Sequence, residues 1–582
     1  MLHRIPEDDV LRRQWNALLE RSGDPQVFYT YEWALAVQRA YEESLRPLVF
    51  LGYDGQGALC GVAAFSSSAT GEASFLCATT GDYCDCLSAP EGRPAFVAAI
   101  FSELKKENIR NLTLTNLPAD SPTVPAIRQQ ARRSGYHHFQ RVAYVCTQFL
   151  LRSAERGKNG EVRIGHTKMI RRSLKTMSTE GPIRLDHMHG WTKAEIELPR
   201  FIRTHVGRFL VTGRISNMAR AQRRVFLREL AKLLSNAGCF CLTRLMTGEK
   251  TVAWNYGFQF SGSWFWYQPT FDSELEKYSP GYCLLTKIIE EAAENPDFKT
   301  VDLGLGTEEY KDRVANQRRK TLYVTLRASA AEHLLEMARY GAARMAKASP
   351  KVEQVIRIAS SAWDHAKKRV STNGFRGTAR WAVQRARTSL LARDEVFFYE
   401  FITQQPLANS TALSLKVTDL DLLAEAAMQY ADDEGTLAYL LRCAEHLRVK
   451  EYTGFALLNA DGEPVHFTWA GPFTGFHWAE LNSTLPAPSP DAVVLFDSWT
   501  PISQRDRGYY SPTLWLAAAR VQQQGKSAWV FSAATNTSSV RGLEKLGLPL
   551  RFSIVRHKVL WWQRLSRHNR ESAMSSERLV AL

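Results

Sequence analysis

Two glycine turns in the sequence lead directly into segments that are typical of helices. Tyr278-Ser279-Pro280-Gly281 precedes CLLTKIIEEAAEN, and RDRGYYSP, which contains Gly508, precedes TLWLAAARVQQQG. A glycine lets the main chain approach a ligand without a side-chain clash, and the first turn of a helix presents free N–H groups and the positive end of the helix dipole. Each turn therefore predicts either an anion cradle suited to a phosphate or an ordinary strand-to-helix connection.

A group of polar side chains surrounds Gly304 and Gly306, at the end of the strand-like TVDLG. Asp302 is a candidate base, or a residue that orients a substrate amine, and Tyr310 and Lys311 are candidates for donating a proton or binding a carboxylate or phosphate. The two glycines indicate either a close approach of the backbone to another group or a plain turn. For Lys311 a structural salt bridge is an equal alternative.

Two further places carry side chains that suit substrate recognition. Asp82, Tyr83 and Asp85 offer two carboxylates beside a phenol, which would recognise an acceptor amine or sugar hydroxyls, or else cap a turn. Tyr267 and Asp272 follow the strand-like GSWFW, and we expect them at the border of a catalytic site. Trp264 and Trp266 in the same run are expected in the core.

Several classes of site lack their residues in this sequence. The histidines show no H-x-x-x-H or H-E-x-x-H spacing, and the nine cysteines form no C-x-x-C pair, so neither a metal site nor a disulfide framework is predicted. No G-x-S-x-G elbow is present, which argues against a serine hydrolase. The run Gly525-Lys526-Ser527 lacks the glycine that a Walker sequence has five residues earlier, which argues against an NTPase.

Three strand-turn-strand segments recur along the chain and supply the elements that must position these residues. They begin at Arg46, Cys241 and Tyr452, and their starts lie about 195 and about 211 residues apart. The second and third are each followed by a strand, a glycine turn, a helix and a strand, while a helix and a strand follow the first. This order predicts three α/β units with mixed sheets flanked by helices.

The positive charge of the chain is concentrated in one segment. The 582 residues carry a net charge of +15, and residues 327–393 contain 14 Lys or Arg against four acidic residues. Apolar residues at helical spacing predict basic amphipathic helices there, which are either solvated linker faces or a surface for an anionic membrane or an acyl carrier protein. DNA is not expected, because no basic run is interleaved with aromatic residues. In HTKMIRRSLKTM, Arg171 either contacts an anionic substrate or lies on a solvated face.

The sequence gives no sign of export or of a membrane span. The start, MLHRIPEDDVLRRQW, has no apolar h-region, and no window approaches the roughly 18 consecutive apolar residues of a spanning helix. We expect a cytoplasmic protein, with peripheral contact with the inner membrane through residues 327–393 as an option.

Residues 25–327 resemble the FemAB-like branch of the GNAT acyltransferases, in particular the CelD-type proteins associated with bacterial cellulose and exopolysaccharide biosynthesis. The resemblance is carried, in this order, by FYTYEWALAV, GDYCDCL, HTKMIRRSLKTMSTEG, WYQPTFDSELEKYSPGYCLLTKIIEEA and VDLGLGTEEYKDRV. It implies two GNAT folds in tandem. It also implies the transfer of an acyl or aminoacyl group to an amine or hydroxyl.

Residues 394–565 resemble a single GNAT unit. Arg505-Asp506-Arg507-Gly508 matches most of the pyrophosphate turn of that fold, and Leu543 stands where many GNAT enzymes have a tyrosine general acid. The resemblance implies acetyl-CoA, another acyl-CoA or an acyl-carrier thioester as the cofactor. The two resemblances together imply cofactor sites at Ser279, Gly281, Tyr282 and Lys311 in the second unit and at Arg505, Arg507, Gly508 and Asn536 in the third.

The sequence therefore predicts an acyltransferase built from tandem GNAT-like folds. The expected ranges are two units at 1–150 and 151–326, a basic helical linker at 327–393, a third unit at 394–565 and a polar tail at 566–582. The expected acceptor is an amine or hydroxyl of a polysaccharide precursor or another cell-envelope metabolite. The alternatives are aminoacyl transfer from tRNA to a peptidoglycan precursor and a non-catalytic scaffold.

Overall fold

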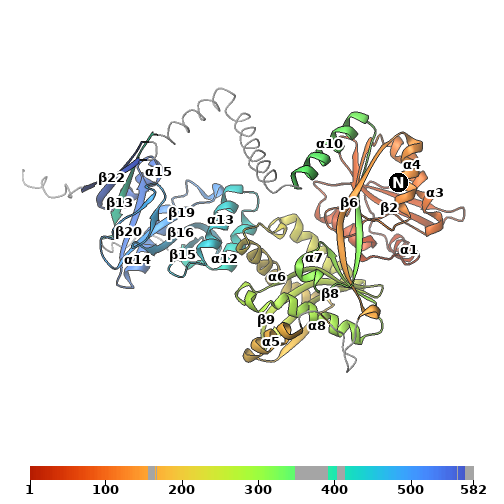
Figure 1. Cartoon of the computed structure of the whole chain (residues 1–582), viewed down its shortest axis with the longest axis horizontal. Helices are drawn as coiled ribbons and strands as arrows, with labels where there is room; N and C mark the ends of the chain where they lie inside the picture. Colours follow the sequence, from red (N-terminus) through yellow and green to blue (C-terminus); the bar gives the residue numbers. More distant parts are fainter. Residues whose placement is uncertain (155–163, 165–166, 348–390, 403–412, 560–561, 570–582) are drawn as a thin grey trace, which may run out of the picture. The chain divides into compact units, whose positions relative to one another are not determined.

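The chain folds into a mixed α/β architecture, as the computed structural model shows (Figure 1). The described residues are 1–154, 164, 167–347, 391–402, 413–559 and 562–569. They belong to two compact units: unit 1 comprises residues 1–208 and 220–345, and unit 2 comprises residues 209–219 and 346–582. The range 1–150 lies within unit 1, and the range 151–326 lies within it except for residues 209–219.

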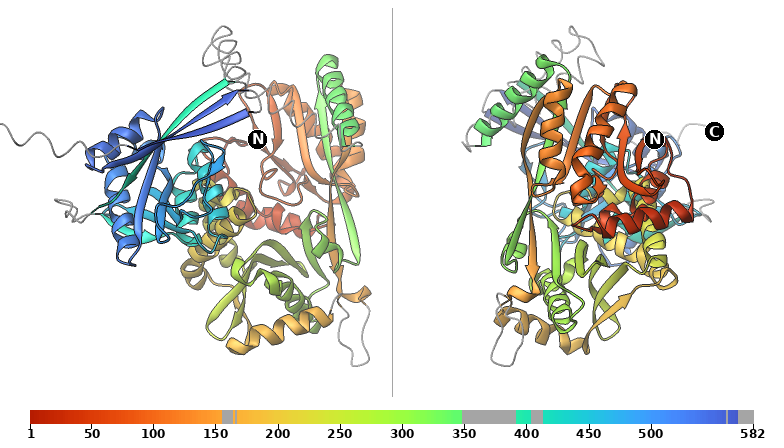
Figure 2. Two further views of the ribbon diagram at one scale, coloured as in Figure 1. Left: turned by 60° about the vertical axis from the view of Figure 1, so that its left-hand side comes forward. Right: turned by 90° about the vertical axis from the view of Figure 1, so that its right-hand side faces the viewer.

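A twelve-stranded sheet runs through unit 1 in the order β1-β2-β3-β5-β12-β6-β11-β10-β9-β8-β7, with β4 beside β2. The strands are β1 Arg46–Tyr53, β2 Leu59–Ser67, β3 Glu72–Phe75, β4 Leu87–Ser88, β5 Asn111–Pro118, β6 His137–Leu150, β7 Ile183–Met188, β8 Phe240–Thr247, β9 Lys250–Phe260, β10 Ser263–Phe271, β11 Thr300–Leu305 and β12 Gln317–Arg327. Strand β6 pairs with β12 over most of its length and with β11 only from Cys146 onward. This long strand therefore joins the two halves of unit 1 (Figures 1 and 2).

The helices of unit 1 pack on this sheet and on one another. They are α1 Asp9–Glu20, α2 Tyr31–Ala40, α3 Arg93–Lys106, α4 Thr123–Ser134, α5 Thr167–Met177, α6 Trp191–Val211, whose last residues belong to unit 2, α7 Ala221–Asn236, α8 Pro280–Glu294, α9 Glu309–Asp312 and α10 Ala330–Lys347. Helix α8 buries Leu284, Leu285, Ile288 and Ile289 against β9 and β10, so its apolar stripe anchors it on the sheet. Among the described residues, no helix has the length and apolar composition needed to cross a membrane.

Unit 2 contains an eight-stranded sheet in the order β14-β15-β16-β19-β20-β13-β21-β22, and a separate β17–β18 pair. Its strands are β13 Leu391–Glu400, β14 Ser414–Val417, β15 Thr453–Leu458, β16 Pro464–Pro472, β17 His477–Trp478, β18 Ser483–Thr484, β19 Ala492–Trp499, β20 Ser527–Ala533, β21 Leu550–Val559 and β22 Trp562–Asn569. Its helices are α12 Leu420–Gln429, α13 Glu434–His446, α14 Tyr510–Gln522 and α15 Thr537–Lys545. Helix α14 packs on β16, β19 and β20 and places Leu514 and Ala517 in the core.

The three predicted hairpins are confirmed as the antiparallel pairs β1–β2, β8–β9 and β15–β16. Each is followed by two parallel strands joined through a helix: β3 and β5, β10 and β11, and β19 and β20. The parallel pairing covers only three, three and four residue pairs respectively, after which the strands separate. Ligands of open α/β sheets bind outside the carboxyl ends of such strands, so these three openings are the places to look for sites.

Only part of the predicted basic linker falls within the described residues. Arg327 ends β12, α10 follows, and residues 348–390 lie outside the described part of the chain. Helix α10 contacts β6 through Tyr340, whose ring centroid lies 5.3 Å from that of Phe139. The contact of residues 327–393 with a membrane or an acyl carrier protein stays a prediction.

Candidate functional site

In unit 1, Asp302 lies on β11 at the point where β10 and β11 separate. It is 2% exposed, and its Oδ2 accepts hydrogen bonds from the Tyr83 hydroxyl at 3.0 Å and from Gln148 Nε2 at 2.7 Å. Its Oδ1 accepts a hydrogen bond from the backbone N–H of Gly304 at 2.8 Å. Burial raises the pKa of Asp302, and these hydrogen bonds oppose that rise. The structure thus brings Tyr83 and Asp302, which are far apart in sequence, into direct contact.

The close approach predicted at Gly304 is made by another side chain of unit 1. Gly304 has a φ of +70°, and a Cβ at this position would lie 2.4 Å from Oδ2 of Asp82. Burial, and next the charge of Asp302, raise the pKa of the partly exposed Asp82 to about 7, while Lys311 and Arg223 act in the opposite direction. Two carboxylates with raised pKa values are typical of functional sites.

Replacement of Gly304 is expected to destabilise unit 1 strongly. Gly304→Ala would combine a strained φ with a clash against the Asp82 carboxylate, at a cost of about 3 kcal/mol in the free energy of unfolding. Gly57→Ala is the matched control, because Gly57 has a φ of +79° and open space around its Cβ, so it should cost only about 1 kcal/mol. Urea denaturation followed by tryptophan fluorescence measures both values, and equal costs would contradict the Asp82 contact.

The raised pKa of Asp82 predicts a pH dependence of stability. Between the usual aspartate pKa of about 4 and the raised value of about 7, the folded protein holds a proton that the unfolded chain releases, so stability falls as the pH rises through this window. Asp82→Asn should therefore match the wild type near pH 4 and exceed it in stability at pH 8. Denaturation curves at both pH values test this, and a variant that is less stable at pH 8 would be inconsistent with it.

The two tyrosines predicted near the catalytic position are engaged in contacts within unit 1. Tyr267 is 7% exposed, and its hydroxyl donates to the carbonyl of Thr80 at 2.5 Å and accepts from Arg223 at 2.9 Å. The hydroxyl of Tyr310 accepts a hydrogen bond from Trp266 Nε1 at 3.3 Å. These contacts hold the tyrosines in place, and their catalytic role stays a prediction.

Lys311 and Asp272 also have local partners. Lys311 Nζ donates to the carbonyl of Leu305 at 2.6 Å and forms an ion pair with Glu308 at 3.0 Å, which agrees with the salt-bridge alternative. Asp272 accepts a hydrogen bond from the N–H of Glu274 and pairs with Lys250 at 3.0 Å, so it caps the short helix that follows it. Both residues have a structural role in unit 1.

The remaining residues predicted to bind substrate differ in exposure. Asp85 accepts a hydrogen bond from the Ser121 hydroxyl at 2.6 Å and lies 3.4 Å from the buried guanidinium of Arg93. Arg171 is exposed on α5. No group of three or more His, Cys, Asp or Glu that could hold a metal ion occurs among the residues that the structure describes.

The first turn of α8 has few N–H groups left for an anion. Ser279 adopts a left-handed conformation with a φ of 50°, and its carbonyl accepts hydrogen bonds from the N–H groups of Tyr282 and Cys283. Pro280 has no N–H, so of the first four residues of the helix only Gly281 keeps an N–H without a local acceptor. Most N–H groups of this turn are therefore absent or already bonded within the turn.

The surroundings of this turn are also apolar. A Cβ on Gly281 would lie 3.1 Å from the Phe271 ring, so the missing side chain lets α8 approach β10. The preceding segment carries Glu274 and Glu276 together with Lys277, and its Asp272 is paired with Lys250. The ring of Phe271 therefore limits the room for a phosphate at this turn.

In unit 2, a pocket of about 1040 Å³ lies where β19 and β20 separate. Arg505, Gly508 and Asn536, three of the predicted cofactor-binding residues, line it together, and Arg507 lies in the same turn. Gly508 has a φ of +77°, and no atom lies within 4 Å of the position that its Cβ would occupy. The main chain is therefore accessible at this turn.

The charge of this pocket favours an anion. Arg505, Arg541 and Lys545 line it against one acidic residue, Asp506. None of the three cations forms an ion pair among the described residues of unit 2. The N-terminus of α14 adds the positive end of its dipole. Pro512 has no N–H and the N–H of Thr513 donates to the carbonyl of Tyr509, whereas the N–H groups of Tyr510 and Ser511 have no acceptor among the described residues.

Two polar groups that the sequence analysis did not single out lie in the same pocket. His466 is 1% exposed, its Nδ1 lies 2.7 Å from Thr500 Oγ1, and its buried Nε2 has no hydrogen-bond partner. Burial lowers the pKa of His466 to about 3, so the imidazole is neutral. The Tyr510 hydroxyl lies 2.6 Å from Ser539 Oγ, and burial raises the Tyr510 pKa. Leu543, at the position expected for a tyrosine, is buried in the core.

Comparison with known proteins gives a family match for one part of the chain. Residues 165–312 match the family model described as an acetyltransferase (GNAT) domain. No curated protein matches the sequence significantly. The CelD-type resemblance therefore stays a prediction.

Several solved structures are similar over a little more than half of the chain. The structure of L-PGS from Bacillus licheniformis has 11% identity and a TM-score of 0.37, covering 56% of this chain and 96% of that chain. The crystal structure of FemX has 9% identity and a TM-score of 0.38, covering 56% of this chain and 98% of that chain. A tandem GNAT protein from the clavulanic acid biosynthesis pathway has 13% identity and a TM-score of 0.32, covering 56% of this chain and 96% of that chain. TM-scores of this size do not establish a shared fold. The family match alone places a GNAT acyltransferase domain at residues 165–312 of this enzyme.

Proposed function

We propose that unit 2 binds the acyl thioester of coenzyme A or of a carrier protein in its pocket of about 1040 Å³. In this proposal the protein transfers the acyl group to an amine or hydroxyl of a saccharide or another envelope metabolite. The observation that carries the proposal is the open Gly508 turn, which shares one pocket with three cations that form no ion pair with any residue that the structure describes. The family match at residues 165–312 independently supports acyl transfer as the reaction class.

The residues of this pocket fit the charged part of such a cofactor. Arg505, Arg541 and Lys545 would hold the phosphates, and the N–H groups of Tyr510 and Ser511 at the start of α14 would bind the pyrophosphate. The absent side chain of Gly508 leaves room for an anion against the main chain. When bound, the thioester supplies an activated acyl carbonyl to this site.

Two side chains of the pocket can orient the acceptor and supply a proton during acyl transfer. The neutral imidazole of His466 can accept a hydrogen bond from the N–H or O–H of the acceptor at its unpartnered Nε2, which orients the attacking lone pair. As the new bond to the acyl carbon forms and the C–S bond breaks, the hydroxyl of Tyr510 can give its proton to the leaving sulfur of a thioester whose pantetheine arm folds back toward the start of α14. The proton that the acceptor loses then restores the Tyr510 hydroxyl through solvent. Ser539, at 2.6 Å, holds that hydroxyl in position.

The proposal is tested by measuring CoA release and thermal stability of the full-length protein with a panel of acyl-CoAs. Saturable stabilisation by at least one acyl-CoA is expected, and transfer should survive treatment with ribonuclease. Transfer that ribonuclease abolishes, without stabilisation by any thioester, would favour the aminoacyl-tRNA alternative. Absence of both effects would leave the scaffold alternative.

A further inference from the structure

We propose that a second pocket, in unit 1, is a binding site for an amino sugar, meaning a hydroxyl-rich ring that carries a protonated amine. This pocket has a volume of about 810 Å³. Residues of β6, β10, β11 and β12 line one side, and residues from segments 22–29, 85–93 and 119–125 line the other. The inference goes beyond the thioester site of unit 2 and does not depend on it.

The charges of this pocket are opposite to those of the pocket in unit 2. The ionisable side chains of acidic or basic residues that line it are Asp24, Asp85, Asp120, Asp302, Arg93 and Arg319. The four carboxylates and two guanidinium groups give a net charge of −2 when all are ionised. Burial raises the pKa of Asp85 and of Asp302, and a cation in the pocket would favour their ionised forms. A pocket of this sign rejects phosphates and favours a cation.

The uncompensated charge can be assigned to particular groups. The Arg319 guanidinium lies 2.6 Å from a carboxylate oxygen of Asp24 and 3.0 Å from one of Asp120, so one positive charge is paired with two carboxylates. Asp85 has its own partner in Arg93. Asp302 is held by neutral donors and forms no ion pair with another described residue of unit 1. An ammonium group in the pocket would supply the missing positive charge.

Two buried polar atoms of the lining lack hydrogen-bond partners in the part of the chain that the structure describes, and they indicate a ligand with hydroxyl groups. Gln26 uses its Nε2 to donate to Asp24 at 2.7 Å, but its Oε1 has no donor. The hydroxyl of Tyr29 also has no partner. Both residues are 7% exposed. A buried polar group without a partner is costly, so each of these atoms calls for a group that would satisfy it.

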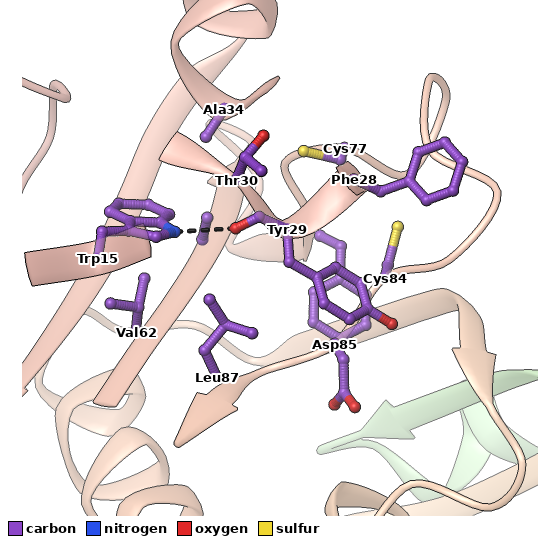
Figure 3. Close-up of a pocket in the computed structure, with 12 residues that line it drawn as sticks. Trp15, Phe28, Tyr29, Thr30, Ala34, Val62, Cys77, Cys84, Asp85 and Leu87 are labelled. Atoms are coloured by element: carbon purple, nitrogen blue, oxygen red, sulfur yellow. Dashed lines mark hydrogen bonds between the residues drawn. The ribbon is translucent and has the colours of Figure 1, made fainter. Parts of the chain in front are cut away.

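Figure 3 is a close-up of a smaller pocket that shares Tyr29, Asp85 and Leu87 with the proposed site, and it shows how Tyr29 is held. Its carbonyl accepts a hydrogen bond from Trp15 Nε1 at 2.9 Å, and its ring extends away from Trp15, on the side where Asp85 lies. Burial and the nearby carboxylates of Asp85 and Asp24 raise the pKa of Tyr29, so its hydroxyl keeps its proton. Tyr29 can therefore donate a hydrogen bond as well as accept one.

Together these groups select among ligand classes. Asp302 and the surplus negative charge favour an ammonium group, Gln26 Oε1 accepts from a hydroxyl, and Tyr29 donates to a hydroxyl or ring oxygen. A neutral sugar offers no positive charge, and a simple polyamine offers no oxygen acceptor for Tyr29. An amino sugar provides all three groups on a rigid ring, and the pocket volume lies in the usual range for small-molecule sites.

Isothermal titration calorimetry of the full-length protein without any acyl donor tests this inference. Glucosamine is expected to bind about tenfold more tightly than N-acetylglucosamine or glucose, because only glucosamine carries the ammonium group. Asp302→Asn should lower the affinity for glucosamine about tenfold and leave the affinity for glucose unchanged. Gly508→Trp is the control for independence from unit 2, and it should bind glucosamine like the wild type.

A second variant keeps the test decisive if Asp302→Asn does not fold. Asp24 lies at the rim with 46% of its side chain exposed, so Asp24→Asn should fold and should weaken glucosamine binding about threefold without affecting glucose. Equal affinities for glucosamine and N-acetylglucosamine, no binding of any of these sugars, or glucosamine binding that neither variant changes would overturn the inference. None of these outcomes bears on acyl-CoA binding in unit 2.

Discussion

Gly508→Trp is expected to lower the rate of CoA release about a hundredfold or more and to remove the stabilisation of the protein by acyl-CoA. The indole would occupy the space beside the turn in which no atom now lies within 4 Å of the Cβ position, and it would block access to the N-terminus of α14. Loss of two or more charge-assisted hydrogen bonds to a pyrophosphate accounts for an effect of about this size. A thiol-release assay and a thermal-shift titration measure the two effects.

Two control variants separate loss of the site from loss of folding. Gly525→Trp places the same side chain in unit 2 at a glycine with a φ of +74° and open space, outside the residues that line the pocket, and it should keep acyl-CoA binding. Gly281→Trp should destabilise unit 1 through contact with Phe271 and leave stabilisation by acyl-CoA in place. If Gly281→Trp removed that stabilisation and Gly508→Trp kept it, the thioester site would have to be moved to unit 1.

Tyr510→Phe is expected to lower kcat about a hundredfold while the affinity for acyl-CoA stays close to that of the wild type. The variant keeps the ring, which packs against the hydrophobic core of unit 2. It removes only the hydroxyl, which lies 2.6 Å from Ser539 Oγ. A proton donor of this kind acts on the leaving sulfur and contributes little to binding.

The matched variant for this prediction is Ser539→Ala, which leaves the Tyr510 hydroxyl present but less firmly held. It should lower kcat by about tenfold or less. Steady-state kinetics with titration of acyl-CoA provide both values, and the alkaline limb of the pH profile should change in Tyr510→Phe. An unchanged kcat in Tyr510→Phe would exclude this tyrosine as the proton donor.

The local part of the fold was predictable from the sequence because its signals are local. Apolar residues on both sides of the short polar turns Asp54-Gly55, Gly248-Glu249 and Asp461-Gly462 predicted the three hairpins, and the structure contains them. The glycine turn at Gly508 and the helix after it were predicted in the same way. Turn chemistry and periodicity act over a few residues, so one sequence is sufficient to detect them.

The joining of the two halves of unit 1 could not be predicted in this way. Strand β12 inserts between β5 and β6, and β6 pairs with strands from both halves, so the register depends on residues that are distant in the chain. The contact between Tyr83 and Asp302 follows from that insertion. Their spacing of 219 residues carries no local signal.

The polar groups in the two pockets could not be predicted from local sequence signals either. His466 lies within a strand of the third hairpin, where no motif marks it, and Tyr510 begins the helix after the Gly508 turn, where the turn motif gives it no role. The unpartnered atoms of Gln26, Tyr29 and His466 can be recognised only once their neighbours are known. Burial without a partner is a property of the folded chain.

The most direct test of the central claim is hydrogen–deuterium exchange of the full-length protein with and without saturating acyl-CoA. The thioester site in unit 2 predicts slower exchange at residues 505–511, which form the Gly508 turn and the start of α14, and at residues 536–546, which contain α15. Residues 273–283, which contain the Gly281 turn of unit 1, should exchange at the same rate in both states. Protection at 273–283 without protection at 505–511 would contradict the claim.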